Sequence, residues 1–333
     1  MNEPNKIKRG VDLELQIESL AYGGMGLARK DDFVIFVKGG IPGQKVNARI
    51  YKKKKGYAEA RVQHVITESP NAVEAPCDHF GTCGGCKTQN LSYDEQLNQK
   101  SNQVEDAFHR LGGFQDFKLD HIVGADPVFN YRNKMEFTFS PHRWVLDTEP
   151  EGVDRSFAVG LHIPGRYDKI LDINECHIQP TIGNKIMKVA REVCLAHPDL
   201  KPYDPKTHIG FLRFLMLRFG VNTNQIMVNL VTAYDDLNKL SPLIDALLEQ
   251  VPEITSMVNN VNTRKADVAF GEFETLVYGE PFIQENLGDL TFEISANSFF
   301  QTNTTQGKHL YDEVVKAAGL TGKEVGFDLY CWT

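Results

Sequence analysis

The chain has 333 residues, of which 41% are hydrophobic and 24% are charged, as in an ordinary globular protein. At roughly 100–200 residues per domain, this length predicts two or three domains. The composition excludes a disordered chain, a collagen-like chain and a small disulfide scaffold. No apolar run approaches the roughly 18 residues of a membrane span, and the first ten residues have no apolar signal core. We therefore expect a cytoplasmic protein with no membrane partner.

The formal charge of −8 is divided unevenly along the chain. Residues 1–65 hold 13 Lys and Arg against 7 Asp and Glu, a net charge of +6, and the remaining 268 residues carry −14. This asymmetry favours a polyanion-binding module joined to an acidic remainder. The sharpest basic feature is the run Lys52, Lys53, Lys54 and Lys55, followed by Tyr57. Taken alone, such a run also fits a solvated hairpin tip.

The N-terminal segment shows the short apolar–polar alternations and glycine-rich turns of a small β-domain. Strands are predicted at residues 11–17, 27–29, 33–37, 46–51 and 57–62. Five short strands in about 55 residues predict a closed all-β barrel of the OB type. A basic barrel with an exposed aromatic side chain can bind RNA through phosphate contacts and stacking.

Three segments of this region carry a resemblance to a known module. The runs 19–29 (SLAYGGMGLAR), 33–42 and 43–46 look like a TRAM domain, an OB-like RNA-binding barrel found on RNA-modifying enzymes. The resemblance implies that residues 1–68 form this barrel. It also makes the four lysines and Tyr57 candidates for RNA binding.

Three of the six cysteines fall within ten residues, as Cys77, Cys83 and Cys86 in a glycine-rich loop. Disulfides are rare in the cytoplasm, so clustered thiolates indicate a metal site that needs a fourth ligand. Cys176, in a polar turn after a strand-like segment, is the best candidate for that ligand. Cys194 lies on the apolar side of a predicted helix and is expected in the core. From the residues alone, zinc and iron–sulfur both stay open, with His79 and His177 as alternative zinc ligands.

The spacing Cys77-x5-Cys83-Gly-Gly-Cys86, followed by Gln89, Leu91, Tyr93 and Gln96, is similar to a known iron–sulfur site. It resembles that of bacterial 23S rRNA (uracil-5-)-methyltransferases, in which a distant motif supplies the fourth cysteine. Residues 172–176 match that motif. The resemblance implies a structural [4Fe-4S] cluster on Cys77, Cys83, Cys86 and Cys176, with zinc as the alternative.

The middle of the chain has the pattern of an α+β domain, which we place at residues 69–290. Ser92 and Glu95 have capping-box spacing, and one apolar face then runs to Leu111 before Gly112. Further strands are predicted at 134–139, 157–163, 211–219, 225–231 and 255–258, with helices at 181–196 and 242–250.

Arginines in this region fall within further blocks of the same family. Residues 131–137 and 210–213 match two blocks, which contain Arg132 and Arg213, and Arg218 follows. Each arginine could contact RNA or form a fold-stabilising ion pair, and the sequence leaves both open. Arg132 is kept as an RNA-binding candidate.

The C-terminal end is expected to open a Rossmann-like α/β domain at residues 291–333. A predicted helix at 304–318 precedes a predicted buried strand at 324–331, and nucleotide-like ligands bind at the carboxyl ends of such strands. In the family, Phe-Phe-Gln-x-Asn and Asp-Leu-Tyr-Cys-Gly-x-Gly form the S-adenosylmethionine site. The resemblance implies that Gln301 and Tyr330 contact this cofactor and that Phe299 lies near the target base.

The second of these motifs is interrupted, because Trp332 stands where the family has glycine and the sequence stops at Thr333. We therefore expect a chain truncated at the start of its methyltransferase domain. In the family the nucleophilic cysteine and the catalytic base come later, and Cys331 belongs to the cofactor motif. Residues 1–333 are expected to bind RNA without transferring methyl groups.

As a whole, the chain resembles the class I S-adenosylmethionine-dependent RNA 5-methyluridine methyltransferases. The resemblance implies that the parent enzyme is a monomer that methylates uridine C5 in ribosomal RNA through a cysteine thiolate adduct. The transfer-RNA branch of the family generally lacks the barrel and the cluster, which favours ribosomal RNA. The alternative is a non-catalytic RNA-binding protein with an iron–sulfur or zinc site.

Overall fold

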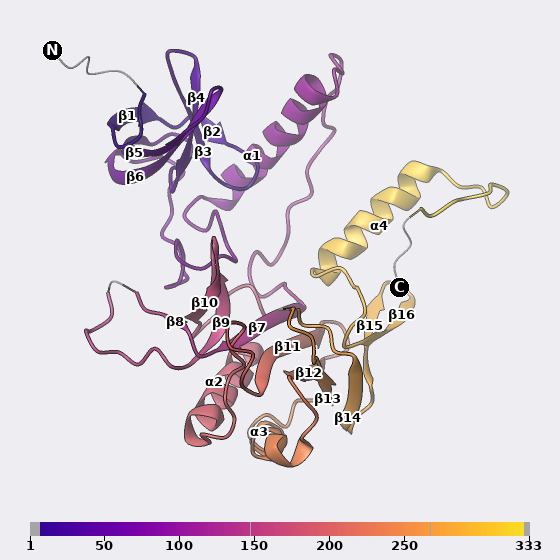
Figure 1. The fold of residues 1–333 in the computed structure, drawn as a ribbon. Helices are drawn as coiled ribbons and strands as arrows, with labels where there is room; N and C mark the ends of the chain where they lie inside the picture. Colours follow the sequence, from indigo (N-terminus) through magenta and orange to yellow (C-terminus); the bar gives the residue numbers. More distant parts are fainter. Residues whose placement is uncertain (1–6, 147, 267, 330–333) are drawn as a thin grey trace. The chain divides into compact units, whose positions relative to one another are not determined.

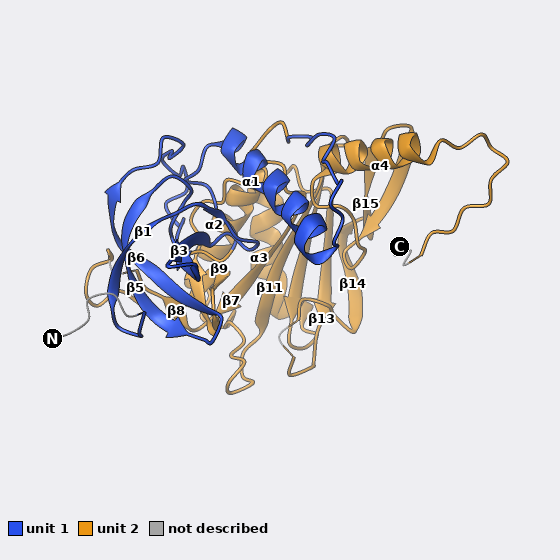
Figure 2. Ribbon diagram, turned by 90° about the horizontal axis from the view of Figure 1, so that it is seen from above, with its two compact units in different colours: residues 1–81, 85–124 blue, residues 82–84, 125–333 orange. Residues whose placement is uncertain are grey.

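The computed structural model describes residues 7–146, 148–266 and 268–329, and the chain forms two compact units. Unit 1 contains residues 1–81 and 85–124, and unit 2 contains residues 82–84 and 125–333 (Figure 2). The domain boundaries expected at residues 68 and 290 remain predictions. Among the described residues, no helix has the length and apolar character needed to cross a membrane.

Unit 1 is built on a six-stranded sheet with the strand order β1-β5-β6-β4-β3-β2 (Figure 1). Its strands are β1 (Asp12–Gln16), β2 (Ser19–Leu20), β3 (Gly26–Lys30), β4 (Phe33–Lys38), β5 (Lys45–Lys53) and β6 (Tyr57–Thr67). Only the β4–β6 pair is parallel. All five predicted strands form. The sixth, β2, is too short for alternation to reveal it.

The alternation that predicted these strands also builds the core of unit 1. Leu13, Leu15 and Ile17 are buried and meet the buried residues of β4, β5 and β6. The intervening positions face outward and carry most of the charge. A one-residue slip of any strand would exchange the two faces, so this pattern fixes the register.

A helix, α1 (Tyr93–Asp106), belongs to the same unit and continues as a single π-helical turn (Ala107–Leu111) before Gly112. The predicted capping box is wrong. The Ser92 side chain makes no capping bond, and the Glu95 carboxylate instead accepts a bond of 2.7 Å from Gln99 Nε2.

Two glutamines of α1 hold the edge strand β2. The backbone N–H of Leu20 donates to Gln99 Oε1 at 2.8 Å, and Gln103 Nε2 donates to the Leu20 carbonyl at 2.9 Å. An edge strand presents unpaired backbone groups. At Leu20, side chains of the helix satisfy both groups.

Unit 2 is built on an eight-stranded mixed sheet with the order β14-β13-β12-β11-β7-β9-β10-β8 (Figure 1). Its strands are β7 (Lys134–Ser140), β8 (Arg143–Trp144), β9 (Ala158–Ile163), β10 (Arg166–Asp172), β11 (Leu212–Gly220), β12 (Gln225–Thr232), β13 (Ser256–Val261) and β14 (Phe273–Gly279). β11 and β12 are buried along nearly their whole length. The predicted α+β pattern is therefore present.

Helices cover one face of this sheet and a hairpin packs on the other. α2 (Thr181–Ala196) and α3 (Leu237–Gln250) share the main core with β7, β11 and β12. The hairpin β15 (Phe282–Leu287) and β16 (Leu290–Ser295) packs through Ile283 and Ile294 against Met227 and Val258. The chain then forms α4 (Thr304–Ala318), which has its predicted bounds.

The strand predicted at 324–331 is wrong over residues 324–329. These residues form coil and a turn and are exposed, and no strand of the described part of the chain pairs with them. Without a pairing partner, an apolar run cannot satisfy its backbone groups as a strand. Tyr330, Cys331, Trp332 and Thr333 lie outside the described residues.

Candidate functional site

The lysine run occupies the tip of the β5–β6 hairpin. The Lys54 N–H closes the turn on the Tyr57 carbonyl at 2.8 Å. Lys52 Nζ binds Glu59 Oε1 at 2.5 Å, and Lys53 Nζ donates to the Ile7 carbonyl at 2.8 Å. The Lys54 and Lys55 side chains are exposed and have no ion pair among the described residues. Two of the four candidate cations are therefore already engaged within the fold.

Aromatic side chains flank this tip. Tyr57 is half-buried and meets Phe36 edge-on, with ring centroids 5.6 Å apart, while Lys52 Nζ lies 5.9 Å from the Tyr57 ring centroid. Phe36 is likewise half-buried. Half-exposed rings beside cations suit the stacking of bases and the neutralisation of phosphates.

Another aromatic residue of unit 1, Tyr22, was not among the RNA-binding candidates predicted from the sequence. Tyr22 is 96% exposed and stands in the turn between β2 and β3. Gly23 and Gly24 follow it with φ of +93° and +84°, which side-chain-bearing residues rarely adopt. The signal in the sequence is an aromatic residue directly before a Gly-Gly turn.

Two of the four predicted cluster ligands, Cys77 and Cys86, belong to unit 1. Cys77 is half-buried, and its burial raises the pKa of its thiol, while backbone N–H groups of His79 and Phe80 oppose the rise by donating to the sulfur. The nearby Cys86 raises the pKa of Cys77 further. Backbone donors aimed at a sulfur are the surroundings in which a metal-bound thiolate is stable.

The other two, Cys83 and Cys176, belong to unit 2 and both pack on its main core. Asn184 of α2 holds the backbone of Cys176 at both ends, with Asn184 Oδ1 2.9 Å from its N–H and Asn184 Nδ2 3.4 Å from its carbonyl oxygen. In residues 7–146, 148–266 and 268–329, no group of three or more Cys, His, Asp or Glu is arranged to hold a metal ion. The donor chemistry fits a cluster, and the four-cysteine ligand set remains a prediction.

Cys194 has the role expected for it. It is buried in the main core of unit 2, where desolvation raises the pKa of its thiol to about 12. It is therefore a packing residue and an inert thiol.

Two of the family-block arginines are buried structural residues. Arg213 donates to the carbonyls of Asn262 at 2.7 Å, Arg264 at 2.6 Å and Ala266 at 2.6 Å, and its guanidinium lies 4.3 Å from the Tyr203 ring centroid. These contacts fix the backbone of the segment that follows β13. The fold-stabilising alternative is correct for this residue, and it acts through backbone carbonyls.

Arg218 has the same type of role beside the C-terminal motif. Its Nε donates to the Ala296 carbonyl at 3.1 Å, and its Nη2 donates to the Ser298 carbonyl. Burial lowers its pKa to about 10, so the guanidinium stays charged at neutral pH. Arg218 thereby fixes the start of the loop that carries Phe299 and Gln301.

A buried network fixes the far end of this loop. The Asn133 amide nitrogen donates to the Gln301 carbonyl at 2.7 Å and to Thr304 Oγ1 at 2.9 Å. Thr304 Oγ1 in turn donates to Glu285 Oε2 at 3.0 Å. The neighbouring Arg132 joins the loop through a backbone bridge to Asn303.

Glu285 is fully buried and anchors this network. Its carboxylate also accepts the backbone N–H groups of Val221 at 2.6 Å, Asn286 at 2.9 Å and Asn222 at 3.0 Å. Four donors satisfy the carboxyl group, as a buried polar group requires. The loop is therefore held by hydrogen bonds at both ends before any ligand arrives.

The two adjacent phenylalanines of the loop have opposite environments. Phe300 packs edge-on against Phe292 with centroids 5.6 Å apart, whereas Phe299 is 61% exposed. Gln301 is half-buried. The fixed loop therefore presents an aromatic ring to solvent beside an amide side chain.

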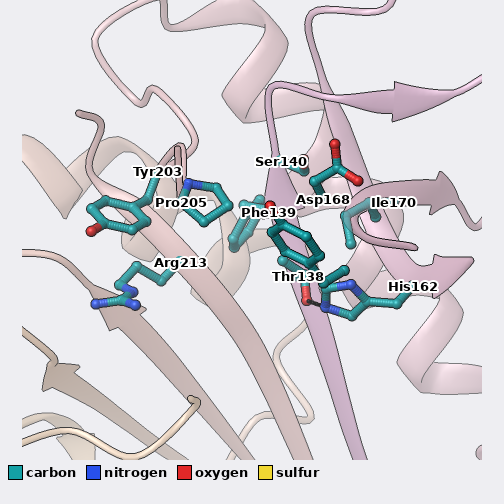
Figure 3. Close-up of a pocket in the computed structure, with 10 residues that line it drawn as sticks. Thr138, Phe139, Ser140, His162, Asp168, Ile170, Tyr203, Pro205 and Arg213 are labelled. Atoms are coloured by element: carbon teal, nitrogen blue, oxygen red, sulfur yellow. Dashed lines mark hydrogen bonds between the residues drawn. The ribbon is translucent and has the colours of Figure 1, made fainter. Parts of the chain in front are cut away.

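A small cavity elsewhere in unit 2 is not a substrate site. Figure 3 shows it between Thr138, His162, Asp168, Tyr203 and Arg213. Its free space of about 10 Å³ matches one water molecule. Thr138 Oγ1 lies 3.3 Å from His162 Nε2 across it.

Comparisons with known proteins agree with this architecture. Residues 6–63 match the TRAM domain family. An RNA methyltransferase of Chlorobaculum tepidum is 38% identical over 98% of this chain and 69% of its own length. A second, from Porphyromonas gingivalis, is 39% identical over 96% of this chain and 70% of its own length.

A solved structure matches most of the chain. The Pyrococcus abyssi tRNA (uracil-54, C5)-methyltransferase in complex with S-adenosyl-L-homocysteine has a TM-score of 0.66 and 26% identity. The match covers 91% of this chain and 64% of that one, so the chain spans about two thirds of the length of the proteins it matches. The resemblance found in the sequence is confirmed: the chain belongs to the RNA methyltransferase family and carries an N-terminal TRAM domain.

Proposed function

We propose that the whole protein transfers a methyl group from S-adenosylmethionine to C5 of a uridine in ribosomal RNA. The observation that carries this proposal is the loop 295–303, which presents Phe299 and Gln301 on a backbone fixed by Arg218 and Asn133. A site prepared in this way loses little further freedom when a ligand binds.

The chemistry assigns distinct roles to these two side chains. Uracil C5 becomes nucleophilic once a thiolate adds to C6, and a base later removes the C5 proton. Bound S-adenosylmethionine supplies the electrophilic methyl group. Gln301, with an amide donor and an acceptor, orients that cofactor, and Tyr330 is proposed as its second contact. Phe299 stacks on the uracil, which must leave its helix to be reached.

The test is methyl transfer by the protein expressed from its complete reading frame. Tritiated S-adenosylmethionine is offered with unmodified ribosomal RNA, and 5-methyluridine is identified by mass spectrometry of the nucleosides. We expect label in ribosomal RNA, and at least a tenfold loss of transfer in Gln301→Ala at limiting cofactor. Label on another base or none would overturn the proposal.

Transfer RNA is a second candidate substrate, favoured by the match to a tRNA enzyme. Because that match covers 91% of this chain, it extends into the N-terminal sheet, which therefore does not separate the two substrate classes. A parallel assay with unmodified transfer RNA distinguishes them, since label confined to transfer RNA would replace the ribosomal assignment.

We also propose that Cys77, Cys83, Cys86 and Cys176 bind a structural [4Fe-4S] cluster, with zinc as the alternative. Support comes from the backbone donors at Cys77 and the fixed backbone of Cys176. Four thiolates fill the ligand set of such a cluster and leave it a structural role.

Anaerobic purification followed by iron, sulfide and zinc analysis tests the metal. We expect about four iron atoms per chain, and their loss in Cys176→Ser. Cys194→Ala is the matched control, because it removes a buried thiol outside the proposed set. Zinc without iron would leave the ligands in place and replace the cluster.

RNA binding by unit 1 completes the proposal. The candidates are Lys52, Lys53, Lys54, Lys55 and Tyr57, together with the exposed Tyr22. We further propose that the protein acts in the cytoplasm as a monomer, with RNA as the polyanion that neutralises its basic segment.

A further inference from the structure

The outward face of the unit 1 sheet carries a row of cations on three adjacent strands. Arg61 on β6 is the register partner of Lys38 on β4 and of Arg49 on β5. All three side chains are exposed and lie on the same face, because their neighbours in each strand are buried. Like charges directly opposite one another in a sheet destabilise it.

Most cations on this part of the sheet are neutralised by a carboxylate. Arg49 forms a bidentate pair with Asp12 at 2.7 Å and 2.8 Å, and Lys45 Nζ lies 2.8 Å from Glu14. Lys52 pairs with Glu59, as described above.

Lys38 and Arg61 differ from these residues. Neither has a carboxylate partner among the described residues. No ion pair within the described part of unit 1 therefore offsets their repulsion.

A third cation joins them from the loop that follows Cys86. A β-carbon on Gly24 would lie 2.7 Å from Cβ of Lys87, so the β2–β3 turn packs directly on this lysine. Lys87 is exposed and also has no carboxylate partner in the described part of unit 1. The register of β4 and β6 places Lys38 beside Arg61. Partial burial lowers the pKa of Lys38, and the charges of Arg61 and Lys87 lower it further, in agreement with both cations lying near it.

We propose that Lys38, Arg61 and Lys87 form a phosphate-binding site for single-stranded RNA, separate from the hairpin tip. Arg61 and Tyr57 are four residues apart on the same outward face of β6, or about 13 Å at roughly 3.3 Å per residue. The rings of Tyr57 and Phe36 lie on this face towards the tip.

The arrangement favours a nucleic acid over an acidic protein segment. Cations lie at both ends of the outward face of β6, and aromatic rings lie near its hairpin end. This arrangement suits single-stranded RNA, because phosphates repeat along its backbone and its bases can stack on the rings. The uncompensated charge of the three residues is then neutralised by the ligand. This inference rests on the proposed RNA-binding function of unit 1.

The experiment measures how binding of a uridine-rich oligoribonucleotide of about 12 residues depends on salt. Each phosphate contact to a single strand contributes about −0.7 to the slope of log K against log salt concentration. The variant Lys38→Ala/Arg61→Ala/Lys87→Ala should therefore reduce the slope by about 2 and weaken binding about 10- to 100-fold at 0.1 M salt. Lys38→Arg should keep the slope.

A matched variant controls for net charge. Lys185→Ala/Lys188→Ala/Lys316→Ala removes three exposed lysines of unit 2 and should leave the slope unchanged. An equal loss of affinity and salt slope in this control would show a general effect of net charge. That result would overturn the proposed site. Thermal unfolding without RNA should show the first variant at least as stable as the wild type, whereas a structural role would lower its midpoint.

The outcomes separate the inference from the function on which it rests. If the wild type binds the RNA and the triple variant keeps the full slope, the site is wrong and RNA binding stands. If the wild type does not bind the RNA, both are wrong. Displacement of the RNA by polyglutamate at equal charge concentration would show an unspecific polyanion surface and also overturn the assignment.

Discussion

Basic residues have opposite roles in the two units. In unit 2, Arg213 and Arg218 are 2% and 4% exposed and donate to backbone carbonyls. In unit 1, Lys38 and Arg61 are exposed, face each other in register and form no ion pair with a carboxylate of the residues that the structure describes. The difference shows that burial and available partners, rather than residue type, decide whether a cation serves the fold or a ligand.

The same contrast holds for the aromatic residues of the C-terminal loop. Phe300 is packed against Phe292, while Phe299 is exposed. Two identical neighbours in sequence thus differ as much as the cations of the two units. Five substitutions at four places test each side of this comparison, and their expected effects on stability decrease from Arg213 to Lys38.

The largest effect is expected for Arg213→Ala. The change removes a buried guanidinium and leaves three carbonyls without their donor, which should lower the free energy of unfolding by about 4 kcal/mol. Denaturant unfolding measures it. The exposed Arg166→Ala should stay within about 0.5 kcal/mol of the wild type, and a similar small loss in Arg213→Ala would contradict the structural role.

The paired substitutions Phe300→Ala and Phe299→Ala come next. Loss of the packed Phe300 ring should cost about 2 kcal/mol, while loss of Phe299 should cost less than about 0.5 kcal/mol. In the complete protein, Phe299→Ala should nevertheless reduce methyl transfer at least tenfold, because stacking on a base is worth about 1–3 kcal/mol. Equal stability losses would erase the contrast between the two rings.

Thr304→Val tests the network that fixes the loop. The substitution keeps the shape but removes the hydroxyl between Asn133 and Glu285, so unfolding should become easier by about 1.5 kcal/mol. Hydrogen exchange of residues 295–303 should accelerate at the same time. The exposed neighbour Thr305 provides the control, since Thr305→Val should change neither quantity.

The smallest effect is expected for Lys38→Gln, which should increase stability where the other substitutions decrease it. Burial and the charges of Arg61 and Lys87 hold the pKa of Lys38 below its ordinary value of 10.5, so the unfolded chain binds this proton more tightly. The penalty is full below the folded pKa and falls as pH rises through it towards 10.5. At neutral pH, Lys38→Gln should therefore raise the free energy of unfolding by a few tenths of a kcal/mol.

This gain should disappear above about pH 10.5, where the wild-type lysine is neutral in both states. Lys45→Gln, which breaks the pair with Glu14, should instead be neutral or slightly destabilising. A loss of stability in Lys38→Gln at neutral pH would mean that Lys38 has a partner within the fold.

The sequence was sufficient where a local pattern carried the information. Apolar–polar patterns and glycine-rich turns predicted five of the six strands of unit 1, and the helices predicted at 181–196 and 304–318 have the bounds of α2 and α4. The strands β2, β8 and β14 and the hairpin β15–β16 were missed, because short or half-exposed strands such as Leu290–Ser295 have no clean alternation. The capping box failed because Gln99 competes for the Glu95 carboxylate, which no local spacing reveals.

The candidate site was predictable only in part for a similar reason. The motif around Gln301 and Phe299 was recognised in the sequence, but the network through Asn133, Thr304 and Glu285 joins residues up to 171 positions apart. The pair Lys38 and Arg61 likewise depends on the parallel register of β4 and β6. Such partners are defined by tertiary structure and leave no local pattern.

The hydrogen bonds from Gln99 and Gln103 to the backbone of Leu20 determine which segment of the N-terminal region can be exchanged between proteins. The TRAM match ends at residue 63, yet the edge strand β2 obtains its partners from a helix that runs to Asp106. A fusion that transplants the sheet alone would carry an open edge prone to intermolecular pairing. In recombination or in protein engineering, the transferable segment of this protein is therefore the sheet together with its helix.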